Sequence, residues 1–376
     1  MRLFVARETN PEETRVALLA SDVARLVALG ADIDVEEGIG RSLDVPDDEY
    51  KQAGAKVSGD RAASLAAEIV LRMGVPTEED IGHLSAEAIH ISVLDPFNHV
   101  EVVKGLAAAK VSAISLDMIP RTTIAQKMDV LSSQANLGGY VAVVLAAGRQ
   151  KKILPMMMTP AGTIAPARVF VIGAGVAGLQ AIATAKRLGA RVDAFDVRPE
   201  AQEQILSLGA KPLTVDLGET GQTEDGYAKK LTDEQLAKQR EAMARQCALS
   251  DIVITTAKVF GRKAPLIVTD AMLDAMKPGS VVVDLAVETG GNVQASQLGK
   301  EVRRKGVLIV GLPELQRRVP VAASQMFSSN LYNLVEHFWD KEAKHLKLDR
   351  DDEIIQGCLI THGGEIVNET VKAAMA

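Results

Sequence analysis

The feature that most limits what this chain can fold into is an alternation of short apolar runs with stretches of helical spacing. A parallel connection between neighbouring strands needs a helix-sized crossover, so strands that alternate with helices predict parallel sheets. The strands that we expect lie at residues 3–6, 32–36, 68–72, 89–93 and 112–116, and then at 168–172, 192–196, 212–215, 251–255, 280–286 and 307–311. The pattern therefore predicts an α/β fold with two doubly wound, Rossmann-like parallel-sheet domains.

Length supports two domains, because the chain has 376 residues and a single core rarely grows past about 250–300. Long helices expected at 130–150 and 328–341 would join the two domains, which makes the first domain discontinuous. We predict a first α/β domain over 1–130 and 320–376, and a second, nucleotide-binding domain over 131–319.

Local signals refine a few of these elements. Ser21 is expected to cap a helix that stops at Gly30, and the helix at 130–150 is expected to break near Gly138-Gly139. The segment 352–367 predicts a hairpin that turns at Gly363-Gly364 and adds to the first domain.

Composition excludes several classes of protein. The formal net charge is −7 and there is no basic run, so nucleic acid is not expected as a partner. Two cysteines cannot form a disulfide framework in a chain of this length, which fits a reducing compartment. The start lacks the pattern of a signal peptide, and the apolar stretch 137–148 is shorter than the ~20 residues of a membrane span. The histidines lack metal-site spacing, so we predict no metal site.

A glycine-rich turn carries the sharpest chemical signal. Gly173, Gly175 and Gly178 form a GxGxxG pattern that follows an expected strand and opens an expected helix. In such a turn the first glycine allows the tight bend, the second lets a pyrophosphate approach the backbone, and the third lets the helix pack on the strand. Asp196 ends the next strand, where an acidic residue accepts hydrogen bonds from ribose hydroxyls, which favours NAD over NADP. The alternative is a glycine turn without a ligand. Arg198 could accept a 2′-phosphate instead, or be a solvated charge.

A second polar stretch spans 120–136, directly before the expected long helix. It offers a cation, an amide and a carboxylate in Arg121, Gln126 and Asp129, which we expect at the mouth of a cleft between the domains. Helix capping and surface solvation explain the same residues equally well. The acidic, glycine-rich segment 217–227 is expected to be a mobile lid or a surface excursion, and Met156-Met157-Met158 is expected to fill gaps in the core.

Several segments together resemble one family. They are the Arg-Gln-Asp stretch at 120–137, the segment Pro155-Met-Met-Met-Thr-Pro-Ala-Gly-Thr163, the glycine turn with Asp196-Val-Arg198, and the segment 284–291. The chain resembles the NAD(H)-binding component (alpha-1 subunit, domain I) of the proton-translocating NAD(P) transhydrogenase, whose fold resembles that of alanine dehydrogenase.

The resemblance implies that this chain binds NAD(H), that a partner subunit binds NADP(H), and that hydride passes directly between the two nicotinamides. A separate membrane-spanning subunit would couple this transfer to proton translocation. The chain would then be an oxidoreductase active only with its partner subunits, a homodimer, cytoplasmic, and peripheral on the inner face of the cell membrane. Direct hydride transfer moves no proton at this site, so no catalytic histidine or cysteine is needed.

The resemblance also assigns residues. Those expected at the reacting end are Arg121, Gln126 and Asp129. Those expected to contact the cofactor are the same three and Ser132, Gly173, Gly175, Val176, Gly178, Asp196, Val197, Arg198, Gly226, Tyr227, Gln239 and Lys258. Lys258 departs from the family, which has an aliphatic residue at this position.

The alternative is an alanine dehydrogenase-like, NAD-dependent amino-acid dehydrogenase. That chemistry requires a lysine, a histidine and an aspartate. The corresponding segments here are Leu71-Arg-Met73, Ile91-Ser-Val93 and Ala286-Val-Glu288, which lack them. A nucleotide-sensing protein without turnover is a third possibility.

Overall fold

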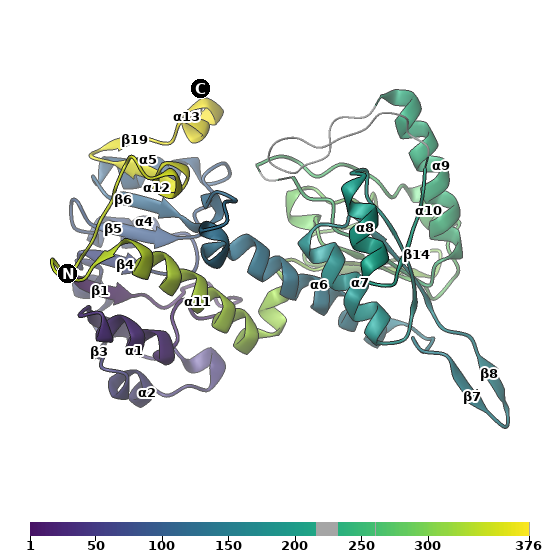
Figure 1. The fold of residues 1–376 in the computed structure, drawn as a ribbon, viewed down its shortest axis with the longest axis horizontal. Coiled ribbons are helices and arrows are strands. Elements are labelled where there is room, and N and C mark those ends of the chain that lie inside the picture. The colour runs from purple at the N-terminus through teal and green to yellow at the C-terminus, as the bar shows by residue number, and fades with distance from the viewer. Residues whose placement is uncertain (216–231, 260, 376) are drawn as a thin grey trace. The chain divides into compact units, whose positions relative to one another are not determined.

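The structure, a computed structural model, describes residues 1–215, 232–259 and 261–375 and divides into two compact units (Figure 1). Unit 1 comprises Met1–Gln134 and Arg317–Ala376, and unit 2 comprises Ala135–Gln316. Each unit has its own sheet of mostly parallel strands with helices around it. The predicted fold class is therefore confirmed.

The sheet of unit 1 has eight strands in the order β19-β18-β6-β5-β4-β1-β2-β3. The strands from β6 to β3 run parallel, and β18 runs antiparallel to β6. Their bounds are β1 Arg2–Val5, β2 Asp32–Glu36, β3 Lys56–Ser58, β4 Ile69–Leu71, β5 Ile89–Ser92, β6 Ser112–Ser115, β18 Leu359–His362 and β19 Glu365–Ile366. The C-terminal hairpin β18–β19 thus extends the first sheet, as predicted.

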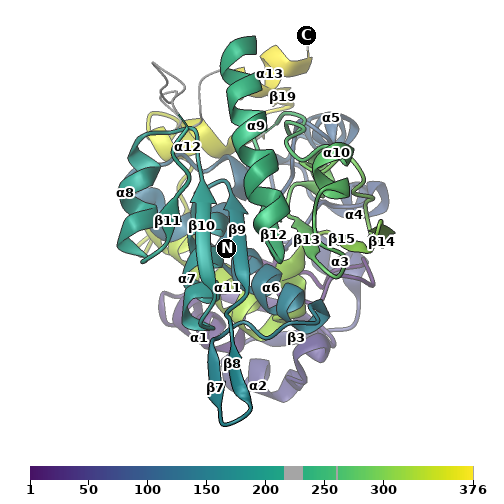
Figure 2. The same cartoon turned by 90° about the vertical axis from the view of Figure 1, so that its right-hand side faces the viewer.

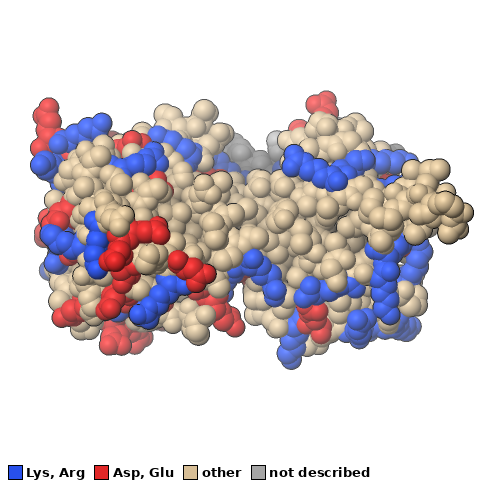
Figure 3. Space-filling view, turned by 90° about the horizontal axis from the view of Figure 1, so that it is seen from below, with Lys and Arg blue, Asp and Glu red and all other residues tan. Residues whose placement is uncertain are grey.

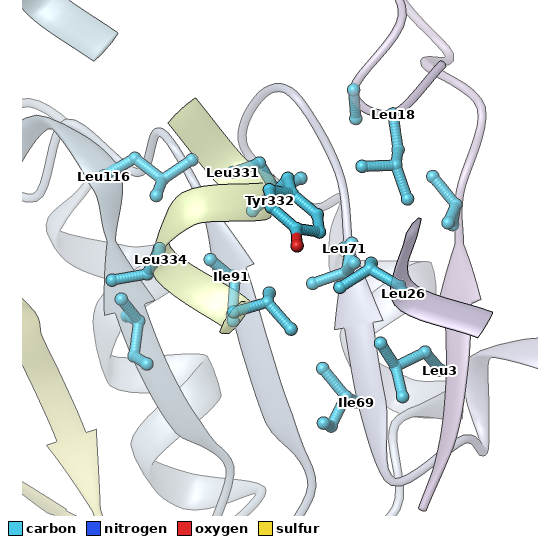
Figure 4. Packing of buried hydrophobic residues seen from close by; sticks show 14 of the residues in the cluster. Leu3, Leu18, Leu26, Ile69, Leu71, Ile91, Leu116, Leu331, Tyr332 and Leu334 are labelled. Atoms are coloured by element: carbon cyan, nitrogen blue, oxygen red, sulfur yellow. The ribbon is translucent and has the colours of Figure 1, made fainter. Parts of the chain in front are cut away.

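Alternate residues of these strands build the main core of unit 1. Leu3, Ile69 and Ile91 all point to the face that is covered by α1 and α11, where they meet Leu26 and Leu331 (Figure 4). The period of two along each strand explains why every second residue joins this cluster. The helices of the unit are α1 Ala20–Ala28, α2 Asp47–Gln52, α3 Arg61–Leu65, α4 Glu78–His83, α5 Val100–Ala108, α11 Pro320–Phe338, α12 Glu353–Cys358 and α13 Glu369–Met375.

The sheet of unit 2 has seven strands in the order β11-β10-β9-β12-β13-β15-β14, seen in Figure 2. All pairs are parallel except β14 with β15. The strands are β9 Arg168–Ile172, β10 Arg191–Phe195, β11 Lys211–Pro212, β12 Ile252–Thr255, β13 Val281–Asp284, β14 Lys300–Arg304 and β15 Val307–Gly311. The chain order reverses between β9 and β12, and ligands of doubly wound sheets bind at such a switch point, beyond the carboxyl ends of the strands.

The helices of unit 2 include α7 Val176–Arg187, α8 Glu200–Ser207, α9 Asp233–Leu249 and α10 Asp270–Asp274. The long helix α6 spans Val130–Arg149 without interruption, so the predicted break near Gly138-Gly139 is wrong. A Cβ atom on Gly139 would lie 2.1 Å from the carbonyl oxygen of Ala177. The glycine therefore serves close packing of α6 against the start of α7. By length and composition alone α6 could span a membrane, a test that core helices of soluble proteins also pass, and half of its most apolar window is buried.

Other local predictions also need correction. Ser21 does not cap α1, whose N-cap is Leu19 without a side-chain hydrogen bond, although the helix does stop before Gly30 with its φ of 90°. Residues 353–358 form helix α12 rather than a strand, because Asp352 accepts hydrogen bonds from the N–H groups of the helix's first turn. The hairpin confirmed at Gly363-Gly364 is accordingly shorter than predicted.

The methionine segment was expected in the core and is exposed. Residues Met157–Thr159 and Gly162–Ile164 form the two-stranded hairpin β7–β8, which projects from unit 2 (Figure 1). Met156, Met157 and Met158 are all exposed on it. The segment 153–167 carries no charged residue, and the hairpin is the uncharged projection at the right-hand edge of Figure 3.

Candidate nucleotide site

The glycine turn lies at the switch point of the sheet of unit 2. It follows β9 and precedes α7, whose N-cap is Gly175. The N–H of Gly173 donates to the carbonyl of Phe195 (2.8 Å), which ties the turn to the end of β10. The first N–H groups of a helix have no partner within the helix and lie at the positive end of its dipole. The turn therefore presents N–H donors suited to phosphate oxygens.

The three glycines differ in what a side chain would meet. Gly173 has φ +99°, which favours glycine, and its Cβ would lie 2.5 Å from the Oγ1 of Thr256. A Cβ on Gly178 would lie 1.9 Å from the carbonyl oxygen of Gly173. A Cβ on Gly175 would meet nothing within 4 Å. The outer two glycines are thus needed by the fold itself, whereas the space beside Gly175 is open above the helix N-terminus.

Asp196 follows β10 and lies beside the same turn. Its Oδ2 accepts a hydrogen bond from the N–H of Ala174 (2.7 Å), so the carboxylate is fixed to the loop that it would serve. Arg198 folds back onto it, with its Nε 3.0 Å from Oδ1 and its Nη2 3.0 Å from Oδ2. The hydrogen bond with Asp196 raises the pKa of Arg198. The predicted ribose acceptor is therefore ion-paired in this structure.

The opposite wall of the turn was not identified from the sequence. Thr256 follows β12 and donates from Oγ1 to the carbonyl of Gly173 (3.0 Å). The buried side chain of Asn292 holds the next residue, accepting from the N–H of Ala257 (3.0 Å) and donating to its carbonyl (2.9 Å). Asp284 in turn accepts from the N–H of Asn292. The only sequence signal for this wall was the segment 284–291, which ends one residue before Asn292.

Lys258 lies just beyond this wall. Its Nζ is 2.7 Å from Oε2 of Glu288, whose Oε1 accepts from the N–H of Glu314 (2.7 Å). Both members of the ion pair are partly exposed. The residue that departs from the family is therefore held at the carboxyl-end edge of the sheet, two residues from the threonine that contacts the glycine turn.

The Arg-Gln-Asp stretch belongs to unit 1. Asp129 caps α6, accepting from the N–H (2.9 Å) and the hydroxyl (2.6 Å) of Ser132. Arg121 and Gln126 are exposed, and the side-chain amide of Gln126 makes no hydrogen bond to any residue that the structure describes. Capping thus accounts for Asp129 and Ser132, but it does not account for Arg121 and Gln126.

The remaining assigned residues are distributed over unit 2. Val176 is exposed in the first turn of α7, and Val197 packs partly buried between Asp196 and Arg198. Gln239 lies on α9 with its Oε1 buried and without a hydrogen bond among the described residues. Gly226 and Tyr227 lie outside the described residues, as does the rest of the segment 217–227 that was expected to be a lid.

The positions that correspond to an amino-acid dehydrogenase site lie in unit 1 and are occupied by a buried ion-pair network. Arg72, which is 1% exposed, donates to Asp80 (2.7 Å) and to Glu8 (3.1 Å). Burial opposes ionisation of Asp80, but hydrogen bonds from Arg61 and Arg72 outweigh it and lower its pKa. A nearby cavity of about 170 Å³ has Glu8, Glu13 and Arg15 among its lining residues, with the latter two paired at 2.7 Å. Within the described ranges no group of three or more His, Cys, Asp or Glu side chains could hold a metal ion.

Comparison with known proteins follows the same division of the chain. Residues 4–138 match the family described as alanine dehydrogenase/PNT, N-terminal domain, and residues 142–369 match its C-terminal domain. The chain is 42% identical to the first of the separately encoded pieces of NAD(P) transhydrogenase subunit alpha in Rhodospirillum rubrum, over 98% of both chains. It is 39% identical to NAD(P) transhydrogenase subunit alpha of Haemophilus influenzae over 97% of this chain and 71% of that one.

Solved structures agree. A crystal structure of transhydrogenase from Sinorhizobium meliloti is 45% identical, with a TM-score of 0.88 over 98% of this chain and all of that one. A structure of L-alanine dehydrogenase is 23% identical with a TM-score of 0.83, covering this whole chain and 99% of that one, and shares the fold. Alanine dehydrogenase of Halomonas elongata is 29% identical over 79% of this chain and 75% of its own. The chain belongs to the alanine dehydrogenase/PNT family, on its transhydrogenase subunit alpha branch.

Proposed function

We propose that this chain is the NAD(H)-binding component of a proton-translocating transhydrogenase. Hydride would pass directly between NAD(H) on this chain and NADP(H) on a partner subunit, and a membrane-spanning subunit would couple that transfer to proton movement. The observation that carries the proposal is the open space beside Gly175 at the N-terminus of α7, with Asp196 fixed to the same turn. The relatives named transhydrogenase subunit alpha support the choice of reaction.

The residues of this chain then have three tasks. The N–H groups at the start of α7 bind the pyrophosphate, and Asp196 accepts from a ribose. Arg121 and Gln126, whose side chains are exposed, orient the nicotinamide end and the approaching partner. The bound nicotinamide supplies the hydride chemistry, so the protein needs to hold the two rings in reacting geometry and exclude water. Asp129 contributes by capping α6 and so fixing the loop that carries Gln126.

An amino-acid dehydrogenase is disfavoured by the chemistry of the corresponding positions. The guanidinium of Arg72 is bound to two carboxylates, and a guanidinium does not lose its proton in proteins. Ser92 replaces the required histidine and cannot act as an imidazole does. Glu288, at the position of the required aspartate, is paired with Lys258. Proton transfer to a substrate therefore has no evident donor or acceptor here.

The proposal includes the assembly. Partners would be separate NADP(H)-binding and membrane-spanning subunits, which would hold this chain at the cytoplasmic, inner face of the cell membrane. A second copy of this chain would cover the hairpin β7–β8. An isolated two-stranded hairpin is marginally stable in water, and this one has exposed Met156, Met157, Met158 and Ile164.

Gln126 and Arg121 provide the test. A residue that acts on transfer geometry lowers the rate of the step while leaving ground-state affinity nearly intact. Gln126→Asn should bind NADH normally, yet slow single-turnover hydride transfer in the reconstituted complex by about 10²-fold, the effect of a misplacement of ~1 Å. Arg121→Ala should weaken NADH binding as well as slow transfer.

The matched control is Lys127→Gln, an exposed neighbour on the same loop, which should change neither quantity. Transfer at the wild-type rate in Gln126→Asn would show that this loop serves only to cap α6.

A further inference from the structure

The carboxylate of Asp196 is fully occupied in this structure. Oδ1 accepts from the backbone N–H and the Nε of Arg198 (2.9 and 3.0 Å), and Oδ2 accepts from Ala174 N–H and the Nη2 of Arg198 (2.7 and 3.0 Å). A carboxylate offers about four lone-pair sites in all. The side chain of Asp196 is 9% exposed, so water does not screen the pair strongly. A ribose hydroxyl therefore finds no vacant acceptor on this residue.

We infer that Arg198 sets the choice between NADH and NADPH by competing with the ribose for Asp196. The inference rests on the proposed function in taking this turn as a dinucleotide site. Two of the four hydrogen bonds come from backbone N–H groups that the fold holds in place. The other two come from the guanidinium, and only these can be given up without moving the loop.

The two cofactors ask opposite things of this ion pair. The free ribose of NADH needs carboxylate acceptors, so it binds by displacing the guanidinium from one or both oxygens. The 2′-phosphate of NADPH cannot bond to a carboxylate, but a guanidinium binds phosphate through paired N–H donors. Because the pair is neutral overall, Asp196 alone does not repel the phosphate as strongly as an unpaired carboxylate would. Discrimination therefore depends on both residues together.

This model predicts opposite effects for two variants. Arg198→Met leaves Asp196 unscreened and free, so the preference for NADH over NADPH should rise about tenfold or more, as expected for a lost charge-assisted contact to phosphate. Asp196→Asn frees the guanidinium for the 2′-phosphate, so the preference should fall by about as much. In the double variant the effects should not be additive, because the two residues are in direct contact.

The experiment is calorimetric titration of the full chain with NADH and NADPH, repeated with 5′-AMP and adenosine 2′,5′-bisphosphate to confine the effect to the adenosine end. Arg198→Lys retains the charge without the planar fork and should give a smaller shift than Arg198→Met. Arg191→Met is the control, because Arg191 is exposed at the opposite end of the same strand, and its preference should be that of the wild type.

Three results have distinct meanings. A rise in NADH preference in Arg198→Met with a fall in Asp196→Asn supports the inference. An unchanged or lowered preference in Arg198→Met overturns it, because Arg198 would then be a bystander or a contact for NADH itself. Wild-type protein that binds neither dinucleotide would overturn the inference together with the proposed nucleotide site.

Discussion

At the scale of single residues, two glycines of one turn separate binding from folding. Gly175→Val should abolish NADH binding and leave the unfolding temperature nearly unchanged, because its side chain enters open space where the pyrophosphate would lie. Gly178→Ala should instead destabilise the fold by about 1–3 kcal/mol, since its Cβ would overlap the backbone oxygen of Gly173. NADH titration beside thermal unfolding of both variants measures this. Normal NADH affinity in Gly175→Val would remove the turn as the phosphate site.

His90 makes a second prediction at this scale, on the pH dependence of stability. Burial, with the nearby Arg72 charge, lowers the pKa of His90 to about 3, whereas an unfolded histidine has a pKa of about 6.5. Between these values the unfolded chain binds the proton and the folded chain does not, so His90 lowers the stability as pH falls from about 6.5. His90→Leu should therefore lose less stability than the wild type between pH 7 and 5, as measured by urea unfolding.

Asp117 serves as the comparison of opposite sign. Burial raises the pKa of its carboxyl to about 6, so the folded chain binds this proton more readily than the unfolded one. Its contribution to stability thus grows as pH falls from about 6 towards 4. Asp117→Asn should lose more stability than the wild type over that range. Identical pH slopes in the wild type, His90→Leu and Asp117→Asn would contradict both assignments.

At the scale of elements, neighbouring glycines in α6 provide a matched pair. Gly139→Ala should destabilise unit 2 by about 1–3 kcal/mol, because its Cβ would lie against the backbone of α7. Gly138→Ala meets only ordinary contact with Gln316, 3.8 Å away, and should stabilise the helix by up to about 1 kcal/mol through its higher helix propensity. Urea unfolding of the two variants checks the sign. Equal effects would mean that α6 does not pack closely on α7.

The same scale shows what the sequence could and could not predict. Buried parallel strands are nearly continuous apolar runs, and Asp32–Glu36, Arg168–Ile172 and Val307–Gly311 match their predicted bounds. Strand β14 was missed because it is a highly charged edge strand, and β7–β8 because its residues are exposed rather than patterned against a core. Helix α12 was mistaken for a strand because six residues are too few to show a helical period.

Site residues divide in the same way. The glycine turn and Asp196 were predictable because their spacing along the chain is set by a strand, a turn and a helix. Thr256 and Asn292 were not, because they reach the turn only through pairing of distant strands. The pairing of Arg198 with Asp196 was also beyond sequence reasoning, since composition does not reveal whether a charge is solvated or bound to its neighbour.

At the scale of the whole molecule, the hairpin β7–β8 predicts self-association. Met158→Glu should weaken a homodimer, because it places a charge at the most exposed of the hairpin methionines. Sedimentation velocity over a range of concentrations measures this. Met326→Glu, an exposed methionine on α11 of unit 1, is the control and should leave the association unchanged. A monomeric wild-type chain would contradict the proposal that a second copy covers the hairpin.

The most direct test of the central claim follows the hydride itself. NADH with deuterium at the transferring carbon would be supplied to this chain in the reconstituted complex, with NADP⁺ as acceptor and ordinary water as solvent. The account predicts that the deuterium appears in NADPH without dilution, that Gln126→Asn slows this transfer, and that the isolated chain shows none. Loss of the label to water, or oxidation of the labelled NADH by a 2-oxo acid and ammonia without a partner, would contradict direct transfer between two nicotinamides.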